Sequence, residues 1–208
     1  MQVLLVHGMG RTTLSMLHLG RRLRRAGHTV NGLGYVAAVE SFAGIVRRVQ
    51  EGFARNAARG PYVVVGHSLG GLLARAALGG QLSSFTRPAH LIMLGTPNRP
   101  PRQARRYGRL LAYRWINGEC GQLLTRDDFF VQLPRLSIPY TIVAGTRGGT
   151  GRSAFGDEPN DGVVAVSETL VVPSDTPITV PARHTFIMND RRVLAAILGV
   201  LQDLEQER

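Results

Sequence analysis

One short stretch of the chain limits the folds open to it more than any other. The apolar run Val63–Val65 leads directly into Gly-His-Ser-Leu-Gly-Gly at positions 66–71. A G-x-S-x-G sequence between a buried strand and a helix is typical of a sharp, strained turn that lifts the serine above the edge of a sheet. Gly66 and Gly70 would remove side chains that collide across such a bend. We therefore expect a strand, a tight turn and a helix around Ser68.

Strand-like and helix-like segments alternate along most of the sequence. Strands are expected at Val3–Val6, Thr29–Tyr35, Tyr62–Val65, His90–Leu94, Tyr140–Ala144 and, as a weaker candidate, Pro177–Val180. Amphipathic periodicity predicts helices at Arg11–Ala26, Ser41–Ala58, Leu69–Leu78 and Arg191–Glu205. Because strands that alternate with helices form parallel sheets, the sequence predicts an α/β fold with a mostly parallel central sheet of about six strands flanked by helices.

The length of 208 residues and the 44% hydrophobic content favour a single domain over residues 1–208. Within it, Pro97–Pro139 interrupts the alternation, since it holds no clear strand and is richer in arginine and aromatic residues than its surroundings. We expect a helical insertion there. It is either a surface crossover between two strands or a lid over the substrate. The apolar residues that such a lid would offer are Tyr107, Leu110, Leu111, Tyr113 and Trp115.

The turn around Ser68 has the composition of a nucleophile site. A serine hydroxyl is a weak nucleophile unless a neighbouring base takes its proton, and an exposed turn gives both base and substrate access to it. Acyl transfer also needs hydrogen-bond donors for the oxyanion. The backbone N–H of Leu69 and that of Met9, in the glycine-rich loop after the first strand, are the candidate donors. His7 and His67 are expected to be structural.

A base and an acid that orients it are expected after Ser68, in the order serine, acidic residue, histidine. Asp161 and His184 follow the last two predicted strands and are our assignment. A glycine and two valines follow Asp161, which indicates a carboxylate turned inward as the chain re-enters the fold. Asp157 and Glu158 in the same loop are the alternative acids. The other histidines away from the glycine motifs lie within a helix or at strand starts, on the opposite edge of the sheet.

Several motifs together resemble the α/β-hydrolase superfamily. These are L-L-V-H-G-M-G, G-H-S-L-G-G, L-G-T-P, N-D-G-V-V and the late His184. The sequence is most similar to the bacterial lipase and esterase branch. Its first predicted strand already carries the oxyanion motif, so we expect the two leading antiparallel strands usual in the superfamily to be absent, as in compact, minimal lipases. This resemblance implies that Ser68 is the nucleophile, Asp161 the acid and His184 the base, with Met9 and Leu69 as oxyanion donors. It leaves interfacial activation open.

The leading hypothesis is therefore hydrolysis of a carboxylic ester through an acyl-Ser68 intermediate, with no metal or organic cofactor. Its substrate would be a small-molecule ester or a lipid. Acyl transfer and cleavage of thioesters or amides would use the same residues, so these activities remain alternatives. A non-catalytic binding domain that kept the fold is a further alternative, although all the expected catalytic residue types are present in order.

The charge of the chain bears on its partners. The formal net charge is +11, and all 25 basic residues are arginine. We expect no nucleic-acid partner, because the arginines are scattered and no recognised nucleic-acid motif accompanies them. Contact with an anionic membrane surface and the oligomeric state stay open. No window approaches the ~18 uninterrupted apolar residues of a membrane span, and no signal peptide is visible. The expected location is the cytoplasm, with secretion of a processed form left open.

Overall fold

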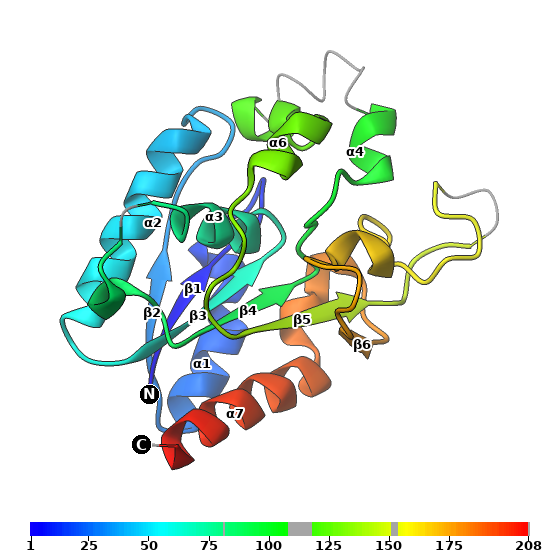
Figure 1. Ribbon diagram of the computed structural model, residues 1–208. Helices are drawn as coiled ribbons and strands as arrows, with labels where there is room; N and C mark the ends of the chain where they lie inside the picture. Colours follow the sequence, from blue (N-terminus) through cyan, green and yellow to red (C-terminus); the bar gives the residue numbers. More distant parts are fainter. Residues whose placement is uncertain (81, 108–117, 151–153, 208) are drawn as a thin grey trace.

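The computed structural model describes residues 1–80, 82–107, 118–150 and 154–207. In this part of the chain, one six-stranded sheet forms in which every neighbouring pair of strands is parallel. The strands are β1 (Gln2–Val6), β2 (Thr29–Leu33), β3 (Tyr62–His67), β4 (His90–Leu94), β5 (Tyr140–Gly145) and β6 (Ile178–Val180). Their order across the sheet is β2-β1-β3-β4-β5-β6 (Figure 1). The predicted parallel α/β fold is confirmed.

Helices cover both faces of the sheet. The α-helices are α1 (Leu17–Arg25), α2 (Phe42–Ala57), α3 (Leu69–Ala77), α4 (Arg102–Tyr107), α6 (Asp127–Gln132) and α7 (Arg191–Gln206). The 3-10 helices are η1 (Thr13–Met16), η2 (Ser84–Thr86), η3 (Val166–Thr169) and η4 (His184–Asn189). Figure 1 shows α2 and α3 on one face and α1 and α7 on the other, which gives three layers.

Each face of the sheet has its own hydrophobic core. Successive side chains of a strand point to opposite faces. In β3, Val64 packs into the core beneath α2 and α3, whereas Val63 and Val65 pack into the core beneath α1 and α7. All six residues of β3 are buried. A strand covered on both faces needs no polar alternation, which explains the continuous apolar run that leads to Ser68.

The long helices begin and pack as their sequences indicate. The Ser41 side chain accepts a hydrogen bond from the Gly44 N–H at the start of α2, and the Asp190 side chain accepts one from the Arg192 N–H at the start of α7. Such caps satisfy backbone N–H groups that have no partner inside the helix. The fully buried residues of α7 recur every four positions, at Val193, Ile197 and Leu201. This spacing places one apolar stripe against the sheet.

The structure differs from the sequence expectations at several element ends. The helix expected over Arg11–Ala26 is divided into η1 and α1, and the strand expected to reach Tyr35 ends at Leu33. Leu33 pairs with Val6, the last residue of β1, so the strand has no parallel partner beyond it. The Tyr35 side chain turns inward instead and donates a hydrogen bond to the backbone oxygen of His7.

The segment from Pro97 to Pro139 connects β4 to β5 and contains α4 and α6, with residues 118–123 also helical. These helices lie beyond the carboxyl ends of the strands, at the top of Figure 1. Leu110, Leu111, Tyr113 and Trp115, which were predicted to give a lid its apolar surface, lie outside the described residues. The choice between a lid and a crossover therefore stays a prediction.

The bend between β3 and α3 depends on two close backbone contacts. A Cβ atom at Gly70 would lie 2.3 Å from the backbone oxygen of Val6, and one at Gly66 would lie 2.4 Å from the Cα of Gly71. Both distances are far below van der Waals contact, and the neighbouring atoms are backbone atoms that have little freedom to move. Glycine at both positions lets α3 start directly against the end of β1.

We expect Gly70→Ala to lower the free energy of unfolding by about 3 kcal/mol or to prevent folding, because its methyl group overlaps the β1 backbone. Gly199→Ala is the matched control, since a Cβ there meets no atom within 4 Å. Because Gly199 lies in the middle of α7, Gly199→Ala should stabilise the protein by about 0.5–1 kcal/mol. Urea unfolding of the two variants measures both effects, and equal stabilities would contradict the steric argument.

Candidate active site

Ser68 stands at the junction of β3 and α3 with an unusual backbone. Its φ is 52° and its ψ is −122°, and it is the single non-glycine residue with positive φ in the described part of the chain. Such a conformation costs free energy and persists only where surrounding structure enforces it. The Ser68 N–H donates to the backbone oxygen of Leu94 at 2.9 Å, which ties the turn to the end of β4.

A continuous hydrogen-bonded chain of side chains starts at this serine. The Oγ of Ser68 lies 2.9 Å from Nε2 of His184, and Nδ1 of His184 lies 2.6 Å from Oδ2 of Asp161. His184 begins η4 just after β6, while Asp161 lies in the loop between β5 and η3. Both are buried, with 8% and 2% of their surface exposed. The structure thus brings together the three residues that the sequence assigned to nucleophile, base and acid.

The carboxylate of Asp161 is held by the loop that carries it. Its Oδ1 accepts hydrogen bonds from the N–H groups of Val163 (2.9 Å) and Val164 (2.7 Å), which leaves Oδ2 for His184. The backbone oxygen of Asp161 also accepts from the His184 N–H at 2.9 Å. A carboxylate oxygen accepts, so the proton of this bond belongs to Nδ1 of His184. Nε2 is then free to accept the proton of the Ser68 hydroxyl.

The two alternative acids lie elsewhere. Asp157 is exposed to solvent. The Glu158 carboxylate forms an ion pair with Arg102 at the start of α4, and the Arg102 Nε lies 3.0 Å from Oε1 of the buried Glu168. Within the described residues, neither Asp157 nor Glu158 forms a hydrogen bond or ion pair with His184, and the side chain of Glu158 is directed to the guanidinium of Arg102 instead. Through these two contacts, Arg102 joins the loop that contains Asp161 to the start of α4.

Gly95, at the end of β4, is a site residue that the sequence analysis did not single out. Its φ is +55°, and a Cβ atom there would lie 3.0 Å from Oδ2 of Asp161 and 3.2 Å from Nδ1 of His184. A side chain at this position would crowd the atoms that form the acid–base hydrogen bond. The signal in the sequence is a glycine directly after a buried strand, in the L-G-T-P motif.

The two predicted oxyanion donors flank the serine. Leu69 is the first residue of α3, and the first N–H groups of a helix have no acceptor within it. Met9 lies in the loop after β1 and lines the same pocket as Ser68 and His184. Such a donor must be held in place before substrate binds, because preorganised dipoles stabilise a developing negative charge best.

His7 and Tyr35 hold the loop that carries Met9. The His7 Nδ1–H donates to the backbone oxygen of Gly8 at 2.9 Å, and its Nε2 accepts the Tyr35 N–H at 3.3 Å. The Tyr35 hydroxyl donates to the backbone oxygen of His7 at 2.6 Å, and the two rings stack with centroids 4.1 Å apart. These contacts are structural, as expected for His7, and fix the chain immediately before Met9.

A pocket of about 290 Å³ opens beside the serine. Its walls are mostly apolar and come from five parts of the chain. The lining residues are Met9, Ser68, Pro97, Pro101, Gln103, Ala104, Leu124, Val163, Val164 and His184. Half of them belong to the Pro97–Pro139 segment, so this segment forms one wall of the space in front of the Ser68 hydroxyl.

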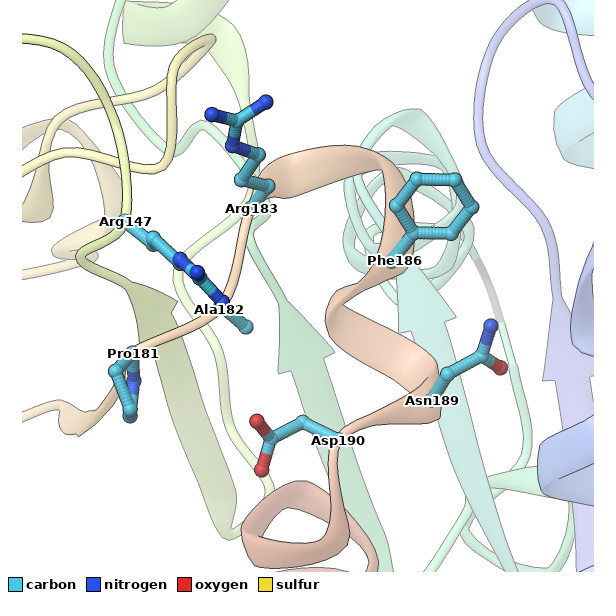
Figure 2. Close-up of a pocket in the computed structure, with 7 residues that line it drawn as sticks. All are labelled: Arg147, Pro181, Ala182, Arg183, Phe186, Asn189 and Asp190. Carbon is cyan, nitrogen blue, oxygen red and sulfur yellow. The ribbon is translucent and has the colours of Figure 1, made fainter.

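The segment that carries His184 borders a second pocket, of about 470 Å³. Figure 2 shows the residues that line it, which are Arg147, Pro181, Ala182, Arg183, Phe186, Asn189 and Asp190. This pocket shares no lining residue with the one beside Ser68. In Figure 2 the Arg183 side chain points away from the carboxylate of Asp190. His184 and its neighbour Arg183 therefore contribute to different spaces.

Other features of the described residues bear on the chemistry. No group of three or more histidine, cysteine, aspartate or glutamate side chains is placed to hold a metal ion there. Burial raises the pKa of the Cys120 thiol to about 11, so this cysteine is no rival nucleophile. No helix in the same residues is both long and apolar enough to cross a membrane.

Comparison with known families agrees with the fold. The model of the alpha/beta hydrolase family matches residues 3–200. The chain belongs to this family, as the motifs predicted. No curated protein sequence matched the chain.

Solved structures share the architecture at low sequence identity. The lipase BlEst2 of Bacillus licheniformis, in its mature form, is 17% identical with a TM-score of 0.70, and the match covers 96% of this chain and 91% of the lipase. Phospholipase PlaB of Legionella pneumophila is 20% identical with a TM-score of 0.64, but the match covers 82% of this chain and only 46% of the phospholipase. Methylketone synthase I of tomato is 14% identical with a TM-score of 0.64 over 97% and 98% of the two chains. At these identities the likeness concerns the fold alone.

The buried histidines predict how stability depends on pH. Burial lowers the pKa of His7, His67 and His90 below the usual value, so each of them takes up a proton at lower pH in the folded chain than in the unfolded chain. Below about pH 6.5 the unfolded chain binds protons that the folded chain does not, so stability falls as pH falls through this region. One such histidine changes the free energy of unfolding by at most about 1.4 kcal/mol per pH unit.

We therefore expect His90→Gln to reduce the slope of unfolding free energy against pH between pH 6.5 and 5, measured by urea unfolding. His18→Gln is the control, because His18 is exposed on α1 and its replacement should leave the slope unchanged. An unchanged slope for His90→Gln would show that this histidine does not contribute to the pH dependence.

Proposed function

We propose that this protein is a serine hydrolase that cleaves carboxylic esters through an acyl-Ser68 intermediate. The observation that carries the proposal is the unbroken chain of hydrogen bonds from Ser68 through His184 to Asp161. These are a nucleophile, a base and an orienting acid in the arrangement that acyl transfer uses. The pocket beside the serine supplies a place for the substrate.

In the first half-reaction, Nε2 of His184 takes the proton of the Ser68 hydroxyl as Oγ attacks the ester carbonyl carbon. The carbonyl oxygen becomes an oxyanion, which the N–H groups of Leu69 and Met9 stabilise. The tetrahedral intermediate then breaks its bond to the alcohol oxygen. The imidazolium of His184 gives its proton to this leaving oxygen, and the alcohol departs from the acyl-serine.

In the second half-reaction, water takes the place of the alcohol. His184 removes a proton from the water as its oxygen attacks the acyl carbon, and the same N–H groups hold the new oxyanion. The bond to Oγ breaks, and the proton on His184 returns to Ser68 as the acid leaves. Asp161 keeps Nδ1 of His184 protonated throughout and stabilises the positive charge that forms twice on the imidazole.

The pocket indicates the kind of substrate. Its walls are apolar apart from Gln103 and the catalytic pair, and its volume of about 290 Å³ lies at the lower end of ligand pockets. An acyl group of short or medium length fits such a space. Lipases and a phospholipase among the structures with this fold agree with an ester or lipid substrate. We assign the Pro97–Pro139 segment the role of a cover over the acyl group.

Acyl transfer and cleavage of thioesters or amides would use the same hydrogen-bonded residues, and these activities differ from ester hydrolysis only in the acceptor and the pocket. A non-catalytic binding domain would not need the Ser68–His184 contact. Hydrolysis is favoured because the fold is that of the alpha/beta hydrolase family and most of the named neighbours are hydrolases.

Ser68→Ala and His184→Ala should each lower kcat for p-nitrophenyl butyrate by roughly 10⁶-fold, and Asp161→Asn by about 10⁴-fold. The losses should not add in double variants, because the three residues act as one unit. Asp157→Asn, in the same loop but exposed, is the matched control and should keep the wild-type rate. All assays contain a chelator and are compared at equal folded fraction.

The assignment of the acid is wrong if Asp161→Asn keeps full activity while Asp157→Asn loses it. The mechanism as a whole is wrong if Ser68→Ala retains turnover and an organophosphonate does not label Ser68 in the native protein. Labelling of Ser68 without hydrolysis of any ester would point to a different acyl acceptor.

A substitution that fills the pocket tests whether the acyl group of the substrate binds there. Ala104→Leu places extra side chain atoms in the wall formed by α4, so kcat/KM for p-nitrophenyl octanoate should fall about tenfold relative to the butyrate. Val131→Leu is the control, because Val131 lies in the same segment but is 84% exposed. If Ala104→Leu leaves the chain-length preference unchanged, the acyl group does not occupy this pocket.

A further inference from the structure

His67 is a buried histidine that the proposed mechanism does not use. It is the last residue of β3, directly before Ser68, and only 2% of its surface is exposed. Its Nε2 lies 3.0 Å from the backbone oxygen of His184. The residue before the nucleophile is thus hydrogen-bonded to the main chain of the base, 117 positions further along the sequence.

The acceptor of this bond determines the tautomer of His67. A carbonyl oxygen only accepts hydrogen bonds, so Nε2 must carry the proton. Nδ1 then bears the lone pair, and within the described residues it has no hydrogen-bond partner. Protonation of Nδ1 would bury a charged N–H group without an acceptor, which costs far more than the loss of an ordinary hydrogen bond. The ring is therefore held in one neutral form.

Three segments of the candidate active site meet at this ring. Ser68 follows His67 directly in the main chain, and the backbone oxygen of His184 accepts the hydrogen bond from the ring. The loop before Met9 packs against its other side, because a Cβ atom at Gly8 would lie 2.8 Å from Nδ1 of His67 and 3.3 Å from Cβ of Ser68. The rings of His67 and His184 lie 5.0 Å apart between centroids.

We propose that His67 is a positioning residue, whose Nε2–H bond to the backbone oxygen of His184 holds the base at the distance that Ser68 requires. The proposal rests on the function proposed above. The main chain of His184 is held from both sides, since its N–H donates to Asp161 and its oxygen accepts from His67. Without His67, the short helix η4 would keep only the first of these restraints at its first residue.

The neutral state of His67 serves the same purpose. His184 becomes positively charged in each half-reaction, and a second positive charge beside it would oppose that step. A neutral histidine fills the space and donates the hydrogen bond from Nε2 without adding charge. A lysine or arginine would donate as well but would bring the charge.

The test compares two neutral replacements of His67. His67→Gln keeps an N–H donor near the position of Nε2, whereas His67→Leu has a similar volume and no donor. A displacement of about 1 Å in a catalytic group costs roughly 10²-fold in rate. We expect His67→Leu to lower kcat for p-nitrophenyl butyrate about 100-fold with KM changed less than about threefold, and His67→Gln to recover at least about tenfold of that loss.

His90→Leu is the matched control. His90 is partly buried, and its Nε2 forms a hydrogen bond with Oγ1 of Thr141, but it begins β4 at the opposite edge of the sheet. Its replacement should lower stability and leave kcat unchanged. The inference is overturned if His67→Leu keeps the wild-type kcat at equal folded fraction, or if His67→Gln is as impaired as His67→Leu.

A measurement on the unaltered protein covers the case in which His67→Leu does not fold. Nitrogen-15 NMR of the histidine rings should show His67 protonated on Nε2 alone from pH 8 to pH 5, and protonation on Nδ1 in this range would overturn the inference. Ser68→Ala, assayed in parallel, separates the two levels of the argument. Retained turnover there contradicts the proposed function, whereas its loss together with a fully active His67→Leu contradicts only the role of His67.

Discussion

The arrangement of the site depends on one backbone constraint, the reversal of the chain between β3 and α3. Ser68 holds a positive φ there, and α3 starts so close to β1 that a methyl group on Gly70 would touch the backbone oxygen of Val6. The energetic cost of this conformation is met by two buried cores and by the hydrogen bond from Ser68 to Leu94. Because the bend is rigid, the base, the acid and the oxyanion donors must be positioned around Ser68 by other segments of the chain.

The parallel sheet does this by placing the ends of its strands at one edge. The loops after β1, β5 and β6 carry Met9, Asp161 and His184 to the same edge as Ser68. Each loop is restrained by its own contacts. Tyr35 and His7 hold the first loop, two backbone N–H groups hold the carboxylate of the second, and His67 holds the main chain of the third. The precision of the site thus comes from many ordinary hydrogen bonds beneath it.

Much of the fold and of the candidate site could be predicted from the sequence, because local patterns of residues encode them. Buried runs and amphipathic periods predicted the positions of the six strands and the four long helices in the described part of the chain, and the order of the motifs singled out Ser68, Asp161 and His184, which the structure brings together. Other features depend on contacts between distant segments. The need for glycine at position 95 arises from atoms of Asp161 and His184, and the partner of His67 lies 117 positions away. The division of Arg11–Ala26 into η1 and α1 likewise follows no local signal that we recognise.

The two separate cores have a consequence for how such a chain can change. In β3, neighbouring residues belong to opposite cores, so one face is defined by Val64 and the other by Val63 and Val65. Insertion or deletion of a single residue in this strand would exchange the two sets and turn Ser68 away from His184. Side chains within the strand can be exchanged for others of similar volume, but its length cannot vary. Insertions and deletions are therefore confined to the connections, and variation in length among related chains should be found in segments such as the one between β4 and β5.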